Sequence, residues 1–397
     1  MLSPIEPCAS GNGLAMRAAV FAEAASSAWA VQVATVAVAG RLPYCPRAVD
    51  VPVLTVPPAG RGEAGRELAR LLADPDWRGL LAATDPMPPP ARAAPPALAP
   101  HVVASCGAAA GTPVLALRSY LAPLGLAVAR ALGAPWAALD LDDDDEGLAR
   151  AEGDHAWADA YRRLVGTFAP RFEAVSLASP GDAGALQERH GFPALTVPNA
   201  VAIPTSRRTE PRRGAVVLFV ANLGYGPNVE AAAVLVREVL PALTARTGRR
   251  AEVVLVGDFD PAGPVPGLAS DPAVTLTGFV AELGDHYARA DVVVAPLASG
   301  SGTRIKLLEA FAHQVPVVTT PVGMAGLDVR PGTEVLVADT PDGLAARAAD
   351  VLGSPSLASA LSTAALAYVT RRHARPVVAA EVVDFLRSAQ GRAGLRR

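Results

Sequence analysis

Two kinds of segment alternate along the chain, and together they predict an α/β protein. Short runs of β-branched residues have the length and composition of buried strands. Alanine-rich stretches with charges at helical spacing have the composition of covering helices. This alternation is typical of βαβ units, in which helices cover both faces of a parallel sheet.

The pattern is clearest in the second half of the chain. The predicted strands are Ala215–Ala221, Glu252–Val256, Val274–Leu276, Asp291–Pro296, Val315–Thr319 and Glu334–Val337. The predicted helices are Asn228–Arg246, Gly284–Ala290, Arg304–His313 and Pro341–Leu352. Such a series of strand–helix units predicts one Rossmann-like domain. The tail Ser356–Arg387 is expected to be helical, with a break at Pro376.

The first half has a looser pattern. Strands are expected at Ala30–Val38, Val51–Val56, Val114–Leu117, Trp136–Leu141 and Thr196–Val197. The proline-dense segment Ala82–Pro100 is expected to be a loop with polyproline character. Pro204–Gly214 is polar, basic and flanked by prolines, which indicates a linker between two domains.

Composition narrows the class of protein. The chain has 397 residues, and at roughly 100–200 residues per domain this predicts two or three domains. Hydrophobic residues make up 51% and charged residues 18%, with a net charge of −3, which excludes a mostly disordered chain. No basic excess is present to neutralise a phosphate backbone, so a nucleic acid is not an expected partner.

The apolar stretch Ala18–Gly40 raises the question of a membrane span. Polar residues such as Glu23 and Gln32 interrupt it, whereas a spanning helix needs about 20 nearly uninterrupted apolar residues. We expect an amphipathic helix followed by a strand there, with no transmembrane segment and no signal peptide.

Cysteine usage bears on the compartment. Three cysteines are scattered without the spacing of a zinc site: Cys8, Cys45 and Cys106. Their odd number argues against a disulfide framework. The sequence therefore predicts a reducing, cytoplasmic compartment.

The strongest candidate for a chemical site is Asp291–Leu327. A predicted strand is followed by a small-residue loop with two glycines, and then by a helix that carries Arg304, Lys306 and Glu309. The amides of a helix N-terminus favour an anion, and two nearby bases add the charge that a diphosphate needs. The alternative is a solvated helix start after a flexible loop.

This region resembles a known family. SGTRIKLLEAFAHQVPVVTTPVGMAGL is similar to the donor-site signature of GT-B glycosyltransferases, especially the retaining group 1 (family 4) enzymes. Other segments agree in order. They are SGNGLAMR, LDLDDDDE, VPNAV, LFVANLGYGPNVEAA, VVLVGD and VTLTGFVAELGDHYARADVVVAPL.

The resemblance implies a GT-B fold, with two Rossmann-like parallel-sheet domains facing across a cleft. Residues 1–205 would form the acceptor-binding domain and 214–372 the donor-binding domain, with helices of about 373–397 packing back on the first. The implied reaction moves a sugar from a nucleotide diphosphate sugar to a hydroxyl or amine of a small molecule or glycan, with retention. The resemblance implies no metal and no cofactor apart from this donor, and it leaves peripheral membrane contact open.

The resemblance also implies roles for single residues. Glu309 matches the second glutamate of the E-x7-E motif and would bind the ribose hydroxyls, while Arg304 and Lys306 would hold the diphosphate. Ser301, Gly302 and Thr303 would add donor contacts, and Gly278, Phe279 and Val280 would line the base pocket through backbone groups. Gly11 and Gly13 would form either a plain turn or a backbone loop that faces the donor phosphates or the acceptor.

Two departures from the family pattern concern the donor. Ser301 stands where the first E-x7-E glutamate would fall, so the sugar contacts would come from backbone and from Ser299 or Ser301. The loop Asn222–Asn228 lacks the arginine and lysine that many members carry, so Arg304 and Lys306 would replace them. Two alternatives remain open, a GT-B sugar-nucleotide epimerase and a catalytically silent partner of another transferase.

Two features of the first half have several interpretations. The acidic run Asp142–Glu146 is expected to be a solvated loop or helix start, with an acceptor-facing role for Asp142 or Asp143 as a further hypothesis. Arg17 would face the cleft or form a surface salt bridge. The six histidines lack any mutual spacing that would indicate a site.

Overall fold

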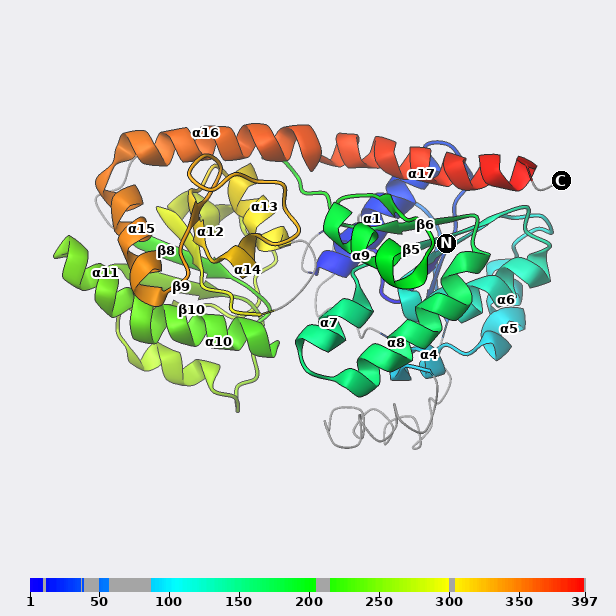
Figure 1. Ribbon diagram of the computed structural model, residues 1–397, viewed down its shortest axis with the longest axis horizontal. Coiled ribbons are helices and arrows are strands. Elements are labelled where there is room, and N and C mark those ends of the chain that lie inside the picture. Colours follow the sequence, from blue (N-terminus) through cyan, green and yellow to red (C-terminus); the bar gives the residue numbers. More distant parts are fainter. Residues whose placement is uncertain are drawn as a thin grey trace. The chain divides into compact units, whose positions relative to one another are not determined.

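Two parallel β-sheets organise the computed structural model of the protein (Figure 1). The structure describes residues 1–9, 12–36, 38, 50–56, 87–204, 215–299 and 304–395. The chain divides into two units, Met1–Asn199 together with Val378–Arg397, and Ala200–Val377. Apart from Pro204, the predicted linker lies outside the described residues.

The N-terminal unit contains a seven-stranded sheet in the order β3-β2-β1-β4-β5-β6-β7, and every pairing in it is parallel. Its strands are β1 (Leu2–Ser3), β2 (Val33–Val36), β3 (Val53–Val56), β4 (Val114–Leu117), β5 (Ala137–Asp142), β6 (Ala174–Leu177) and β7 (Leu195–Thr196). The five strands predicted in this half all form. The sequence pattern did not predict β1 and β6, because LS and AVSL each contain a serine and so form no continuous apolar run.

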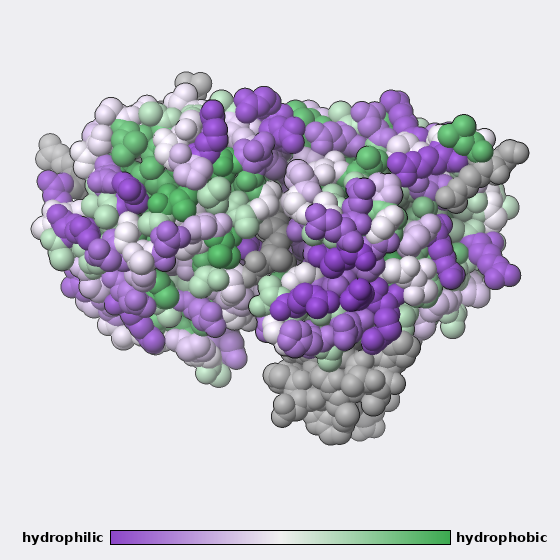
Figure 2. Space-filling view, viewed as in Figure 1, coloured by the Kyte–Doolittle hydropathy of each residue, from purple (hydrophilic) through white to green (hydrophobic). Residues whose placement is uncertain are grey.

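Helices pack against this sheet and against one another. They are α1 (Gly13–Ser26), α4 (Pro89–Ala93), α5 (Ala99–Cys106), α6 (Ala122–Leu132), α7 (Asp145–Ala151), α8 (His155–Phe168), α9 (Pro180–His190) and the long C-terminal α17 (Arg375–Leu395). Phe21 of α1 and Phe385 of α17 meet edge to face, with ring centroids 6.3 Å apart. The end of the chain therefore completes the core of the N-terminal unit. Figure 2 shows hydrophilic residues gathered over α8 and α9, where Asp159, Arg162 and Glu188 are exposed.

The structure corrects the prediction made for the proline-dense segment, of which residues 87–100 are described. From Pro89 onward the chain forms α4, a 3₁₀ turn at Pro96–Leu98 and the start of α5, rather than a polyproline loop. Each of these pieces has proline within its first two positions. A proline costs nothing there, because the first amides of a helix have no carbonyl partner inside the helix.

The second unit contains a six-stranded parallel sheet in the order β10-β9-β8-β11-β12-β13. Its strands are β8 (Val216–Val220), β9 (Glu252–Val256), β10 (Val274–Leu276), β11 (Val292–Ala295), β12 (Val317–Thr319) and β13 (Leu336–Val337). All six were predicted, because runs such as VVLFV and VVVA are apolar on both faces, as a sheet covered by helices requires. Both units are thus parallel α/β sheets.

The helices of this unit are α10 (Gly226–Val234), α11 (Leu240–Thr247), α12 (Gly284–Arg289), α13 (Ile305–Ala312), α14 (Pro321–Met324), α15 (Pro341–Gly353) and α16 (Pro355–Arg372). A π-helical turn, Leu235–Val239, joins α10 to α11. Pro241 follows that turn and has no amide to donate, which accounts for the wider turn. α16 packs against α13 and α15 (Figure 1). The predicted break in the tail is confirmed, because α16 ends at Arg372 and α17 begins next to Pro376.

One glycine marks the close approach of two strand ends in the second unit. Gly257 follows β9 with φ +145°, and a Cβ there would lie 1.7 Å from the carbonyl oxygen of Ala221, just after β8. Only glycine permits this approach. The loops that leave β8 and β9 are therefore held together at the carboxyl edge of the sheet.

Two further observations concern the membrane and the cysteines. None of the helices in the described ranges is both long and apolar enough to cross a bilayer. Cys8 is disulfide-bonded, whereas Cys106 is free.

Candidate functional site

The candidate site lies where the strand order of the second sheet reverses. The chain runs outward from β8 through β9 and β10, and then returns to place β11 on the other side of β8. In open parallel sheets, ligands bind outside the carboxyl ends of the strands at such a reversal. The loop after β8 and the loop–helix after β11 both leave the sheet there. These two segments include the predicted diphosphate contacts.

Arg304 is held at the start of α13. It occupies the N-cap position, its side chain is largely buried, and Nη2 lies 3.4 Å from the carbonyl oxygen of Val322 in α14. Its charge therefore sits beside the amides that open α13, which also favour an anion. The predicted contacts Ser301, Gly302 and Thr303 lie outside the described residues.

Lys306 joins the two loops of the reversal. Its Nζ donates to Oδ1 of Asn228 at 2.6 Å and lies 5.0 Å from the ring centroid of Phe219, a buried residue of β8. Burial and the neighbouring charge of Arg304 lower the pKa of Lys306 to about 7, although Glu309 partly opposes this. An anion bound nearby would favour the charged ammonium again. The side chains around Lys306 therefore neutralise its positive charge only in part.

Glu309 lies on the same helix, one turn further on. The hydroxyl of Tyr287 donates to its Oε2 at 3.3 Å, and the Tyr287 ring stacks on His313 with centroids 4.5 Å apart. Burial raises the pKa of Glu309 to about 7, while Tyr287 and Lys306 act in the opposite direction. A half-buried carboxylate held by a fixed phenol is suited to accept hydrogen bonds from ligand hydroxyls.

Asn228 is a residue of the site to which the sequence pattern assigned no role. Its Nδ2 donates to the carbonyl oxygen of Asn222 at 2.9 Å, while its Oδ1 accepts from Lys306. Asn222 in turn caps its own loop, because its Oδ1 accepts from the amide of Gly224 at 2.9 Å. The proline–asparagine pair at 227–228 was the available signal. The structure shows that this amide links the loop after β8 to α13.

The predicted base-pocket residues lie at the same edge, after β10. Gly278 has φ +74°, and its carbonyl accepts from the amide of Gly257 at 3.0 Å and from the hydroxyl of Thr277 at 3.0 Å. Phe279 and Val280 follow, half-buried. β9 separates β10 from β8, so these residues flank the strand-order reversal on one side.

The two glycines predicted in the first half belong to the N-terminal unit. Gly11 lies outside the described residues. Gly13 opens α1, whose cap is Asn12, with Oδ1 accepting from the amides of Leu14 at 2.9 Å and Ala15 at 3.3 Å. Two of the first amides of α1 are therefore occupied by the protein's own side chain.

The acidic run is not solvated, which corrects the prediction. Asp142, Asp144, Asp145 and Glu146 are each at most 9% exposed, although the run does begin a helix, α7. Most of their basic partners come from distant segments, although Arg150, four residues after Glu146 on α7, also pairs with Glu146 at 3.0 Å. The contacts from distant segments are Arg118 with Asp142, Asp143 and Asp145, Arg189 with Asp144 and Glu146, and His190 with Glu146 at 2.9 Å. Burial, helped by Asp143, raises the pKa of Asp142 to about 7.

Arg17 is likewise not at the surface. It is 3% exposed and binds Asp140 with two bonds of 2.7 Å, from Nε and Nη2. It also donates to Asn199 Oδ1 at 3.0 Å and to the carbonyl of Val197 at 2.9 Å. Burial would lower the pKa of Arg17, but Asp140 and Asp142 raise it above its usual value. Within the described ranges, no group of three or more His, Cys, Asp or Glu side chains could hold a metal ion.

A family comparison identifies the second unit. Residues 214–354 match the family described as "Glycosyl transferases group 1", and they contain Arg304, Lys306, Glu309 and Asn228. The chain carries a group 1 glycosyl transferase domain. The predicted family resemblance is thereby confirmed at this level. No curated protein matches the sequence significantly.

Solved structures show the fold of the chain. Sucrose-phosphate synthase from Thermosynechococcus elongatus is 15% identical, with 97% of this chain and 98% of that chain covered and a TM-score of 0.72. Anabaena HepE in complex with UDP and glucose is 14% identical, with coverage of 98% and 99% and a TM-score of 0.65. The chain spans only about half of S. aureus TarM, at 50% and 54% of the TarM chain in two structures. The fold is the GT-B fold shared by these proteins, as predicted.

Proposed function

We propose that this glycosyltransferase moves a sugar from a nucleotide diphosphate sugar to an acceptor hydroxyl or amine, with retention of the anomeric configuration. The observation that carries the proposal is the pairing of Lys306 with Asn228 across the strand-order reversal, beside Arg304 at the start of α13. That arrangement offers two positive charges and a helix N-terminus to one anionic group. A nucleoside diphosphate leaving group supplies such an anion.

Each group of residues in the site then has a separate role. Arg304 and Lys306 stabilise the negative charge that grows on the diphosphate as the glycosidic bond breaks, an effect of preorganised charge. Glu309, fixed by Tyr287, binds the ribose hydroxyls. Gly278, Phe279 and Val280 line the base, with Gly278 held in place by Gly257. In this proposal no metal cofactor is required, because the side chains supply the positive charge.

UDP-sugars are the first donors to test. HepE has been solved with UDP-glucose, and the proposal extends this donor class to the present chain. A panel of UDP-, GDP- and TDP-sugars would be incubated with the protein, and release of the nucleoside diphosphate followed with and without EDTA. NMR of the product would report the anomeric configuration.

Two variants test the site. We expect Arg304→Ala to lower turnover about 100–1,000-fold, the effect typical of removing one preorganised donor of charge stabilisation. Glu309→Ala should mainly weaken nucleotide binding, measured by calorimetry with UDP. Arg347→Ala, an exposed arginine paired with Asp350 in the same unit, is the matched control and should leave both unchanged.

The two alternatives give different results in the same experiments. An epimerase would convert the donor sugar in the absence of an acceptor, which NMR detects. A silent partner of another transferase would bind none of the nucleoside diphosphates. Full activity in both Arg304→Ala and Glu309→Ala would show that the site has been assigned to the wrong residues.

A further inference from the structure

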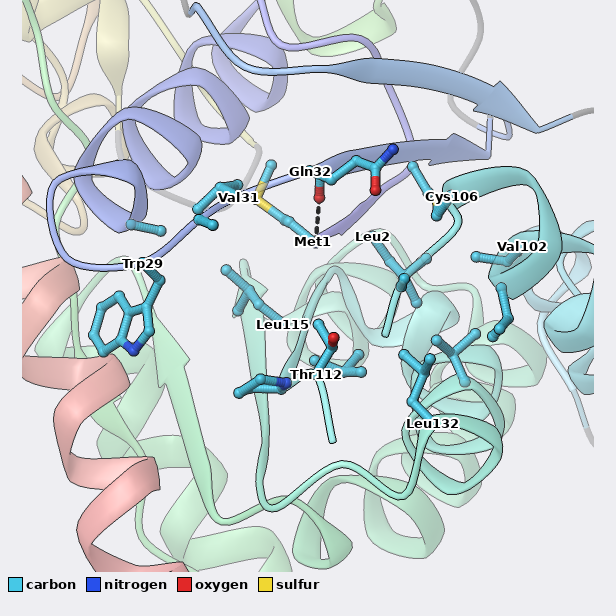
Figure 3. Close-up of a pocket in the computed structure, with 18 of the residues that line it drawn as sticks. Met1, Leu2, Trp29, Val31, Gln32, Val102, Cys106, Thr112, Leu115 and Leu132 are labelled. Atoms are coloured by element: carbon cyan, nitrogen blue, oxygen red, sulfur yellow. Dashed lines mark hydrogen bonds between the residues drawn. The ribbon is translucent and has the colours of Figure 1, made fainter. Parts of the chain in front are cut away.

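The N-terminal unit contains a cavity of about 670 Å³ that the proposed reaction does not use. It lies at the amino edge of the seven-stranded sheet, where strands begin. Leu2 starts β1, while Gln32, Thr112 and Trp136 stand at or just before the starts of β2, β4 and β5. Figure 3 shows these segments and α5 arranged around the open space.

The cavity is remote from the carboxyl edge of the same sheet. β5 has Trp136 before its first residue and Asp142 as its last, so the strand itself separates the cavity from the buried acidic run. At about 3.3 Å per residue, six residues span roughly 20 Å. All lining residues belong to the N-terminal unit, whereas Arg304, Lys306 and Glu309 belong to the other. The cavity is therefore a separate site.

Its lining has a definite chemistry. No Asp, Glu, Lys, Arg or His contributes to it, and most of its residues are alanine, valine, leucine or tryptophan. Trp29 and Trp136 form an edge-to-face pair on its wall, with ring centroids 6.1 Å apart. Three polar side chains interrupt the apolar surface, from Gln32, Cys106 and Thr112. No cationic side chain there offers a countercharge to a phosphate or a carboxylate. The Met1 ammonium also lines the cavity and donates to the carbonyl oxygen of Gln32 at 2.7 Å, but burial lowers its pKa to about 6, so it supplies little positive charge at neutral pH and burial of an anion would be costly.

The size of the cavity also points to a ligand. Protein interiors pack closely, and few voids exceed the size of a water molecule. Ligand sites measure roughly 300–1,000 Å³ and have apolar walls with a few polar groups. Thr112 donates its hydroxyl to the carbonyl of Ala109 at 2.6 Å, so its oxygen is left to accept. The amide of Gln32 can both donate and accept.

We propose that this cavity binds a neutral, largely apolar small molecule, whose one or two hydrogen-bonding groups face Gln32 and Thr112. The ligand is a single molecule of drug size, and it binds independently of the nucleotide site. The apolar walls supply the affinity through buried area, and the polar side chains orient the ligand.

A pair of fluorescent probes tests the chemistry. N-phenyl-1-naphthylamine is neutral, and 8-anilinonaphthalene-1-sulfonate has the same rings with one added sulfonate. At pH 8, where the Met1 amine is neutral, we expect the neutral probe to bind the full-length protein with one-to-one stoichiometry and about tenfold or more tighter than the sulfonate, because no cationic side chain lines the cavity. Equal affinity for the two probes, or no binding of the neutral one, would overturn the proposal.

Variants on α5 test the location. Cys106 lines the cavity, whereas its neighbour Ser105 is exposed and does not. Cys106→Trp should fill the space and weaken the neutral probe about tenfold or more, while Ser105→Trp on the same helix should leave its affinity unchanged. If Cys106→Trp does not fold, Val103→Phe replaces another half-buried lining residue of α5. Unchanged probe affinity in the folded filling variant would place the probe elsewhere.

Cys106 also reports on the site without any substitution. Its pKa is raised by burial, so its thiol should react slowly with N-ethylmaleimide. A saturating neutral probe should slow alkylation of Cys106, measured by peptide mass spectrometry, about tenfold further, and UDP should have no effect. An unaltered alkylation rate at probe saturation would contradict the assignment. UDP binding in Cys106→Trp, which we expect to be unchanged, separates this result from any failure of the proposed transferase site.

Discussion

Two groups of buried charged residues, one in each unit, differ in how their charges are balanced. In the N-terminal unit, Arg17 meets Asp140 through two short bonds, and the surrounding carboxylates raise the pKa of the arginine. In the second unit, Lys306 bonds to the neutral amide of Asn228, and its pKa falls to about 7. The first group is compensated by the protein itself, whereas in the proposed function an anionic ligand compensates the second.

This contrast separates buried charges that stabilise the fold from buried charges that we assign to ligand binding. A buried pair with two well-formed bonds and further hydrogen bonds holds distant segments together. A buried cation beside neutral oxygens destabilises the unliganded fold, and it persists because binding makes use of it. A raised pKa alone does not separate the two groups, because burial raises the pKa of both Glu309 and Asp142 to about 7.

The largest effect should come from breaking the compensated pair. Arg17→Ala leaves Asp140 buried without its partner, and removal of one member of such a pair costs about 3–5 kcal/mol. Urea unfolding followed by circular dichroism would measure the loss. The exposed pair of Arg246 with Asp342 provides the control, since Arg246→Ala should cost no more than about 1 kcal/mol. A loss of similar size in both variants would mean that Arg17 is not a structural anchor.

The second largest effect is expected at Lys306, where a substitution should reduce activity and leave stability intact. Lys306→Met keeps the length of the side chain and removes a poorly compensated charge, so the free energy of unfolding should stay the same or rise. Turnover with a sugar nucleotide should fall about 100–1,000-fold, because the diphosphate loses a preorganised cation. Unfolding and turnover are measured on the same preparation. If Lys306→Met were markedly destabilised but kept full turnover, Lys306 would be a structural charge like Arg17, and the two groups would not differ.

The smallest effect is a pH dependence of nucleotide binding. Lys306 binds UDP as the ammonium, and its pKa of about 7 in the free protein should rise when the anion is bound. The affinity for UDP should therefore fall as the pH rises above 7, by up to about tenfold per pH unit, with proton uptake detectable in calorimetry. Glu309 raises the pKa of Lys306, so Glu309→Gln should move the fall to lower pH, and Lys306→Met should abolish it. Persistence of the fall in Lys306→Met would assign it to another group.

Sequence pattern predicted the second unit better than the first for a physical reason. Its strands are covered on both faces, so each appears as an apolar run, as in Val292–Ala295 and Glu252–Val256. The N-terminal unit includes β1, in which Leu2 pairs with Ala34 of β2 and with Ala116 of β4. Long-range pairing makes that strand, and Leu2–Ser3 contains no apolar run that would mark it in the sequence.

Some residues of the candidate site could be predicted from the sequence, whereas others became evident only in the structure. The chain alone indicated Arg304, Lys306 and Glu309, because two bases at the start of a helix after a glycine-containing loop are unusual without an anion. It did not indicate Asn228, whose role arises only when the loop after β8 lies beside α13. The prediction that the acidic run is solvated was wrong for the same reason, since its partners Arg118 and Arg189 are distant in sequence.

The sequence by itself therefore determined the α/β class, and it predicted a donor-type loop with Arg304, Lys306 and Glu309 after it, because these depend on local composition and spacing. Tertiary structure decided which charges are neutralised. It placed Arg17 against Asp140 and Arg118 against Asp143, and it left Lys306 with an amide. The electrostatic state of a buried group depends on neighbours that folding brings from distant segments, and spacing along the chain does not encode their distance.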